Sequence, residues 1–115
     1  MSPTTPDREN KAQTIEAYFR CVLEGRLAEL PVTEDYGSES PLSGPVESPR
    51  AVEYLGEIGK EMKDIRIVRH IVEGDWVATH FEEVLPNGVL PVVGLFQFRD
   101  DRIRHVRVFF DSAAP

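Results

Sequence analysis

His80 and Glu82 are the two residues whose types and spacing best fit acid–base chemistry. They stand two positions apart in residues 76–85, where apolar and polar residues alternate, and alternate residues of a strand project from the same face. A carboxylate beside a histidine favours the charged imidazole, which can then exchange a proton near neutral pH. We therefore predict that both side chains line one wall of a pocket, beside Trp76 and Ala78, and transfer a proton.

The opposite face of the same stretch supports a second interpretation. Val77, Phe81 and Leu85 are apolar and form a core face by themselves. On that interpretation, His80 and Glu82 are a solvent-exposed ion pair that contributes about 0–1 kcal/mol to stability. The residues alone leave both interpretations open.

Tyr18 and Asp35 are the next candidates for chemistry. Tyr18 lies on the apolar stripe of a predicted helix, where its ring either packs in the core or donates a hydrogen bond to a developing oxyanion in a pocket. Asp35 acts as a general base if the chain buries it, because burial raises a carboxyl pKa towards neutral. Before Tyr36 and Gly37 it also fits an ordinary turn residue, and Tyr36 shares both interpretations.

A metal site is not indicated by the histidines or by the cysteine. His70, His80 and His105 fall on different predicted strands and lack the HxH or HExxH spacing of zinc sites. The single Cys21 excludes an internal disulfide and a cysteine-based zinc site, and fits a small buried hydrophobe. We therefore expect no metal and no cofactor.

Two helices are predicted to position these residues. Pro6 suits the first turn of a helix that ends at Gly25. Its apolar stripe, at helical spacing, consists of Ala12, Ile15, Phe19, Val22 and Leu23. A second helix is expected to start at Ser48-Pro49, with Ser48 as its cap, and to run to about Met62. Residues 26–36 are ambiguous, and residues 37–49 are expected to form an ordered loop.

Four strands are predicted to follow the helices. They are residues 65–72, 76–85, 89–98 and 102–110, and Gly74-Asp75, Pro86-Asn87-Gly88 and Asp100-Asp101 form the turns between them. Helices followed by strands joined through hairpins indicate an α+β fold with an antiparallel sheet.

The third and fourth of these strands are apolar on both faces. Leu90, Val92, Phe96 and Phe98 are expected to point one way, and Val93 and Leu95 the other; in the last strand Val106, Val108 and Phe110 are expected to oppose Ile103 and Phe109. A single sheet with two apolar faces needs cover on both sides. The helices can cover one face, so we predict a homodimer through the outer face. The alternative is an outer face that is merely apolar.

Length and charge limit the classes of protein that fit. The chain has 115 residues, which suits one domain over residues 1–115. The net charge of −7 opposes binding to nucleic acid. No apolar run is long enough to span a membrane, and Met1 to Asp7 contain no apolar signal core. We therefore expect a cytoplasmic protein with neither nucleic acid nor membrane as a partner.

Three segments resemble the nuclear transport factor 2-like superfamily, in its SnoaL-like branch. Residues 103–111 look like its closing strand, residues 93–100 like the strand before it, and residues 33–44 like the segment before its second helix. The resemblance covers nearly the whole chain. It implies a cone-shaped α+β barrel, in which the N-terminal helices pack on a curved antiparallel sheet that encloses a pocket. This fold carries isomerases, cyclases, hydrolases and binding proteins, so its motifs are specific for fold and weak for function.

Two enzyme families of that superfamily match the sequence only in part. The ketosteroid isomerase pattern implies Tyr18 as oxyanion donor and Asp35 as base, but its second acidic donor falls at Gly94. The limonene epoxide hydrolase pattern, an arginine and an aspartate two apart with a later aspartate, falls on His80, Glu82 and Val108. Neither set of catalytic residues is complete, so the resemblance implies a pocket without implying either reaction.

From these observations we expect a small SnoaL-like enzyme without a cofactor. It would isomerise, cyclise or open an epoxide of a compact apolar molecule, such as a polyketide, terpenoid or steroid-like compound. The catalytic residues would be His80, Glu82, Tyr18 and, in reserve, Asp35. The residues expected to shape the cavity are Trp76, Tyr36, Val92, Phe96, Val108 and Phe110. The alternatives are a non-catalytic small-molecule binding protein and a dimeric interaction module on the same fold.

Overall fold

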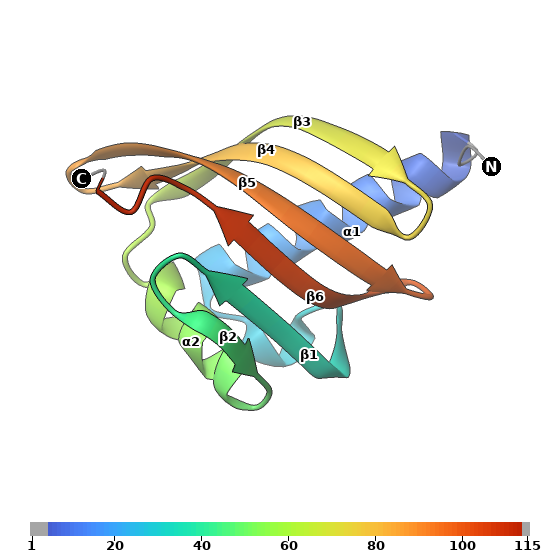
Figure 1. Cartoon of the computed structure of the whole chain (residues 1–115), viewed down its shortest axis with the longest axis horizontal. Coiled ribbons are helices and arrows are strands. Elements are labelled where there is room, and N and C mark those ends of the chain that lie inside the picture. The colour runs from blue at the N-terminus through green and yellow to red at the C-terminus, as the bar shows by residue number, and fades with distance from the viewer. Residues whose placement is uncertain (1–4, 114–115) are drawn as a thin grey trace.

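The computed structural model describes residues 5–113 as two helices packed on one curved sheet (Figure 1). The helices are α1 (Thr5–Glu24) and α2 (Arg50–Gly59), with a short 3-10 helix η1 (Leu27–Glu29) after α1. The strands are β1 (Val32–Ser40), β2 (Gly44–Glu47), β3 (Asp64–Glu73), β4 (Trp76–Leu85), β5 (Gly88–Arg99) and β6 (Arg102–Phe109). Among the described residues, no helix is long and apolar enough to cross a membrane.

The six strands form one sheet in the order β2-β1-β6-β5-β4-β3. The three hairpins from β3 to β6 were predicted and are confirmed, and so is the α+β fold with a curved sheet. The sheet is mixed rather than purely antiparallel, because β1 pairs with β6 in parallel. Because this pairing joins residues far apart in the chain, local patterning did not indicate it.

The loop predicted over residues 37–49 is wrong for most of its length. Ser38 and Glu39 belong to β1, where they pair with Val106 and Arg107 of β6. The segment carries few of the β-branched and aromatic residues that are typical of strands. Its strand conformation follows from the hydrogen bonds that the edge of β6 supplies, which is a tertiary effect.

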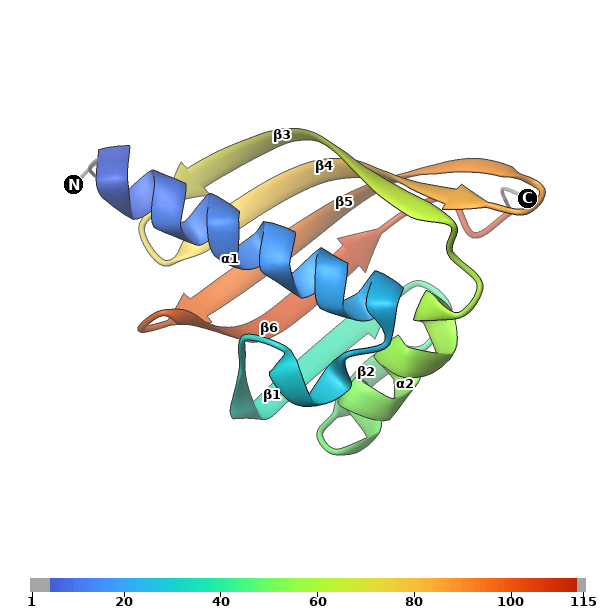
Figure 2. The ribbon, with the colours of Figure 1, turned by 180° about the vertical axis from the view of Figure 1, so that it is seen from behind.

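Both helices lie on the concave face of the sheet (Figure 2). The stripe predicted on α1 is confirmed, since Ile15, Phe19 and Val22 are buried in the core together with Tyr18. Gly25 ends α1 with φ of 71°, a conformation that glycine adopts without strain. The predicted serine cap of α2 is wrong, because the Ser48 hydroxyl donates to the Tyr36 carbonyl oxygen, 2.6 Å away.

The two helices approach closely at Gly59, near the end of α2. A Cβ atom at this position would lie 2.4 Å from the carbonyl oxygen of Val22 in α1. Glycine therefore allows α2 to pack directly against the end of α1, beside β1 and β2.

The concave face carries the core, and its residues follow the strand alternation. On β5 these residues are Leu90, Val92, Phe96 and Phe98, as predicted. The prediction for Ile103 on β6 is wrong, because a β-bulge shifts the register between Gln97 and Phe98. Ile103 therefore pairs with Phe98 and is fully buried on the concave side.

Candidate functional site

A cavity of about 310 Å³ lies between the two helices and the concave face of the sheet. Its walls come from α1, β1, α2, the last strands and the chain that follows β6. Aromatic side chains make up much of the wall, namely Tyr18, Phe19, Tyr36, Tyr54, Phe81, Phe96 and Phe110. A mostly apolar cavity with a few polar groups is the usual form of a small-molecule site.

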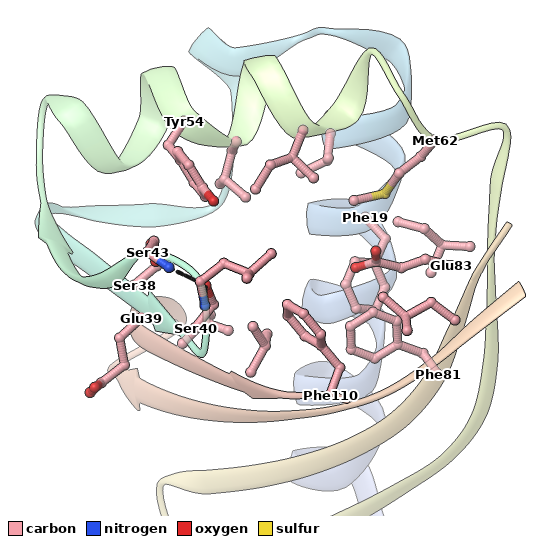
Figure 3. A pocket seen from close by; sticks show the side chains of 18 of the residues that line it. Phe19, Ser38, Glu39, Ser40, Ser43, Tyr54, Met62, Phe81, Glu83 and Phe110 are labelled. Atoms are coloured by element: carbon pink, nitrogen blue, oxygen red, sulfur yellow. Dashed lines mark hydrogen bonds between the residues drawn. The ribbon is translucent and has the colours of Figure 1, made fainter. Parts of the chain in front are cut away.

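The polar groups of the wall occupy different sides of the cavity (Figure 3). Glu83 lies beside Phe81 on one side, and Ser38 lies on the opposite side, on β1. Tyr54 projects from α2 with its hydroxyl group towards the cavity. A ligand in the cavity would therefore meet a carboxyl group at one side and hydroxyl groups at others.

Tyr18 and Tyr36 form a buried hydroxyl pair at the cavity wall. Their oxygen atoms are 2.6 Å apart, and Tyr36 is fully buried on β1. Burial raises the pKa of Tyr36 to about 12 and raises the pKa of Tyr18 well above its usual range. Both hydroxyls therefore keep their protons, of which the pair uses one, and Tyr36 also hydrogen-bonds the Ser38 side chain in the same wall.

Glu83 is the carboxyl group inside the cavity. It projects from the concave face of β4, and burial raises the pKa of its carboxyl group. Its negative charge in turn raises the pKa of Tyr18, so the two groups interact. Among residues 5–113, no hydrogen bond or ion pair links the Glu83 carboxylate to another side chain. Burial therefore makes this carboxyl group easier to protonate than an exposed glutamate, which suits a group that accepts a proton and later returns it.

The predicted orientation of His80 and Glu82 is wrong. Val77, Thr79 and Phe81 are buried on the concave face of β4, so the residues between them point outward. His80 is exposed and Glu82 is half-buried, and neither lines the cavity. The second interpretation of the sequence, in which the apolar alternation marks the inner face, has the right orientation.

Trp76 lies on the outer face as well, with 40% of its surface exposed, and does not line the cavity. The cavity prediction holds for Tyr36, Phe96, Val108 and Phe110, which are all in the wall. Val92 lies on the concave side but packs fully in the core without reaching the cavity.

Asp35 lies outside the cavity, at an exposed position of β1. The hydrogen bond from the Arg99 guanidinium, the Thr33 hydroxyl at 2.8 Å and the Arg104 guanidinium at 3.1 Å lower its pKa to about 2. The expectation that burial would raise this pKa is wrong. A carboxylate held by two guanidinium groups is a weak base near neutral pH.

The three histidines do not form a metal site. Among the described residues, no cluster of histidine, cysteine, aspartate and glutamate has the arrangement that holds a metal ion. His70 lies on the concave side of β3, where its Nδ1 is 2.8 Å from the Thr79 hydroxyl. Cys21 is buried and packs in the core.

Glu83, Tyr54 and Ser38 were missed by the sequence reasoning. The signal for Glu83 was present, since it is the one charged residue on the face that carries Val77, Thr79, Phe81 and Leu85. A charged residue on a core face is unusual unless it has a function or a partner. No comparable signal marked Ser38, because β1 was not recognised as a strand, and none marked Tyr54 on α2.

Neither a protein-family model nor a curated protein matches the sequence of this chain. Many solved structures match its fold. The epoxide hydrolase/cyclase-like enzyme SalBIII, described for pyran ring formation in the polyether salinomycin, matches with a TM-score of 0.80 at 21% identity over 92% of this chain and 94% of that chain. An NTF-2 like protein of unknown function from Burkholderia xenovorans LB400 matches with a TM-score of 0.74 at 17% identity, over 94% of this chain and 89% of that chain.

The chain has the NTF2-like fold. A putative ketosteroid isomerase from Kribbella flavida DSM 17836 shares this fold, with a TM-score of 0.73 at 18% identity over 93% of this chain and 82% of that chain. Identities this low establish the NTF2-like fold and leave the reaction open, because one fold carries many functions. Gly94 and Val108 stand where the ketosteroid isomerase and limonene epoxide hydrolase patterns have an acid, and both lie on the concave side. Val108 lines the cavity, and a Cβ atom at Gly94 would lie 2.9 Å from the ring of Phe96.

Proposed function

We propose that this protein is an enzyme that moves a proton on a compact apolar molecule without a cofactor. The observation that carries the proposal is Glu83, a carboxyl group with a raised pKa in an apolar cavity that it shares with Tyr18. The structural neighbours that are named as epoxide hydrolase/cyclase-like enzyme and putative ketosteroid isomerase support an acid–base reaction of this class.

Isomerisation fits the polar groups of the cavity better than epoxide opening by water. In an isomerisation, the Glu83 carboxylate removes a proton from a carbon beside a carbonyl group, and the electron pair moves to the carbonyl oxygen. The Tyr18–Tyr36 hydroxyl pair donates a hydrogen bond that stabilises that oxygen, and Glu83 returns the proton to another carbon. One carboxyl group serves both steps. Opening an epoxide with water needs an acid and a base at the same time. Of the carboxyl groups in the wall, Asp111 is exposed and Glu39 points away from the cavity, which leaves Glu83.

The test uses a β,γ-unsaturated cyclic ketone in heavy water. Proton transfer through Glu83 should produce the conjugated ketone, followed by ultraviolet absorbance, and should exchange deuterium into the ring, followed by NMR. Glu83→Gln should slow both processes by about 100-fold or more. Glu82→Gln is the matched control, because it makes the same change at the neighbouring residue on the outer face, and should leave the rate within about twofold.

A rate equal to the uncatalysed rate, or an equal loss of rate in Glu83→Gln and Glu82→Gln, would contradict the proposal.

A non-catalytic binding protein is the second candidate. It is favoured by Gly94 and Val108, which leave two acid positions of related enzymes empty. Saturable binding of the ketone with no deuterium exchange would favour that candidate.

A further inference from the structure

The charged residues that line the cavity all have one sign. Glu83 lies in its wall, and Asp111 and Glu39 lie at its margin. Among the described residues that line it, none is a lysine, arginine or histidine. The margin contributes less than Glu83, because Glu39 points away from the cavity and is 3.8 Å from the His105 imidazole and 3.9 Å from the Arg107 guanidinium.

The uncharged part of the wall favours a positive charge as well. Aromatic rings carry negative potential on their faces, and aromatic cages are the common way in which proteins hold ammonium groups. Here rings reach the cavity from both helices and from four strands or strand ends, and Phe110 lies at the bottom of the view in Figure 3. A carboxylate ligand would meet no cation and would be repelled by Glu83.

We propose that the natural ligand of this cavity is a compact apolar amine, bound with its nitrogen protonated between the Glu83 carboxylate and the surrounding aromatic rings. The inference deepens the proposed function by naming the substrate class of the same site. An ammonium group beside Glu83 favours the ionised carboxylate, which is the form that removes a proton, and it also lowers the carboxyl pKa and so weakens the base. The cavity volume of about 310 Å³ is at the lower end for ligand sites, so the amine is small.

The probes are three molecules with the same cage and different charges. They are 1-adamantanamine, 1-adamantanol and 1-adamantanecarboxylate, measured by calorimetry on the full chain at about pH 7.5, where the amine is cationic and the acid anionic. We expect the amine to bind about tenfold or more tighter than the alcohol, and the carboxylate to bind weakest.

Two variants separate charge recognition from simple fit. Glu83→Gln should weaken binding of the amine about tenfold while changing that of the alcohol less than about threefold, and Glu82→Gln should change neither. Phe110→Leu keeps an apolar side chain of similar size and removes the ring face. Phe110→Leu should therefore weaken binding of the amine more than binding of the alcohol.

Three results would overturn the inference: a carboxylate that binds as tightly as the amine, equal weakening of amine and alcohol in Glu83→Gln, or no binding of the amine at millimolar concentration. These results are separate from the test of catalysis. If the alcohol binds best and Glu83→Gln still stops isomerisation, the substrate class is wrong and the proposed function stands. If the amine binds as expected and no variant affects proton transfer, the substrate class stands and the proposed function is wrong.

Discussion

Glu82 and Glu83 are neighbours in the sequence and lie on opposite faces of one strand. Glu83 faces a cavity with aromatic walls, and burial raises the pKa of its carboxyl group. Glu82 lies on the outer face, where its strand partner on β5 is Pro91. Two residues of the same type therefore have different chemistry, because a shift of one residue along a strand exchanges the inside for the outside.

The two faces of the sheet differ in the same way. The concave face is covered by α1 and α2, and most of its residues on β5 and β6 are buried. The outer face exposes apolar residues that the described chain does not cover, among them Trp76, Val93 and Phe109. The concave face therefore holds the core and the cavity, and the outer face is open to another partner or to solvent.

The largest expected difference between the faces is in stability. Phe96→Ala removes a fully buried ring from the concave face and should lower the free energy of unfolding by about 3–5 kcal/mol. Val93 lies three positions earlier on β5 and 42% of its surface is exposed, so Val93→Ala should cost less than about 1 kcal/mol. Urea unfolding of both variants measures the two values. Equal losses would mean that the outer face is also a packed interior.

The second prediction concerns the homodimer that we expect to form through the outer face. Val93 and Phe109 are strand partners on β5 and β6, and both are about half exposed. A charge in this apolar region should weaken a dimer formed through it, so Phe109→Glu should raise the dimer dissociation constant about 100-fold or more. Sedimentation velocity measures the change.

Leu42→Glu is the control for the dimer, because Leu42 is an exposed apolar residue in the turn between β1 and β2, at the cavity margin. It should leave the association state unchanged. A wild-type chain that stays monomeric at high concentration would show that the outer face is apolar without being an interface.

His70 lies on the concave side, and its protonation should make the stability of the protein depend on pH. Burial lowers the pKa of His70, and Glu16 on α1 offsets part of this effect. The unfolded chain therefore binds a proton at His70 below about pH 6.5, while the folded chain binds it only at lower pH. The stability contributed by neutral His70 is complete above about pH 6.5 and falls as the pH drops below it.

Thermal unfolding between about pH 7.5 and 5 would measure this dependence. His70→Gln keeps a polar side chain beside Thr79 and should flatten the curve in that range. His80→Gln, on the outer face, is the matched control for the exchange of histidine for glutamine. The same slope in wild type and in His70→Gln would refute the assignment to His70.

The smallest effect is expected at Asp35. Its ion pairs with Arg99 and Arg104 are exposed, so Asp35→Asn should lower the melting temperature only slightly at neutral pH. The lowered pKa, about 2, means that this contribution is present above about pH 4 and is lost as the pH falls towards 2. Loss of turnover in Asp35→Asn would return Asp35 to the list of catalytic residues.

The sequence by itself determined the parts of the fold that depend on local patterns. The stripe on α1, the stop at Gly25 and the three hairpins after α2 were all predictable, because helical spacing, strand alternation and turn residues act over short distances. Tyr18, Tyr36, Phe96, Val108 and Phe110 were predicted for the cavity and do line it.

Only the tertiary structure decided which face of β4 lines the cavity and which secondary structure residues 32–47 adopt. In this fold the helices cover the same face that carries the core, so the cavity and the core share one face of β4, and Glu83 takes the place that His80 and Glu82 were expected to fill. The strand β1 is held by hydrogen bonds to β6, which is distant in sequence, and no local propensity reports such a pairing. Asp35 was misjudged for the same reason, because Arg99 and Arg104 reach it only after the sheet has formed.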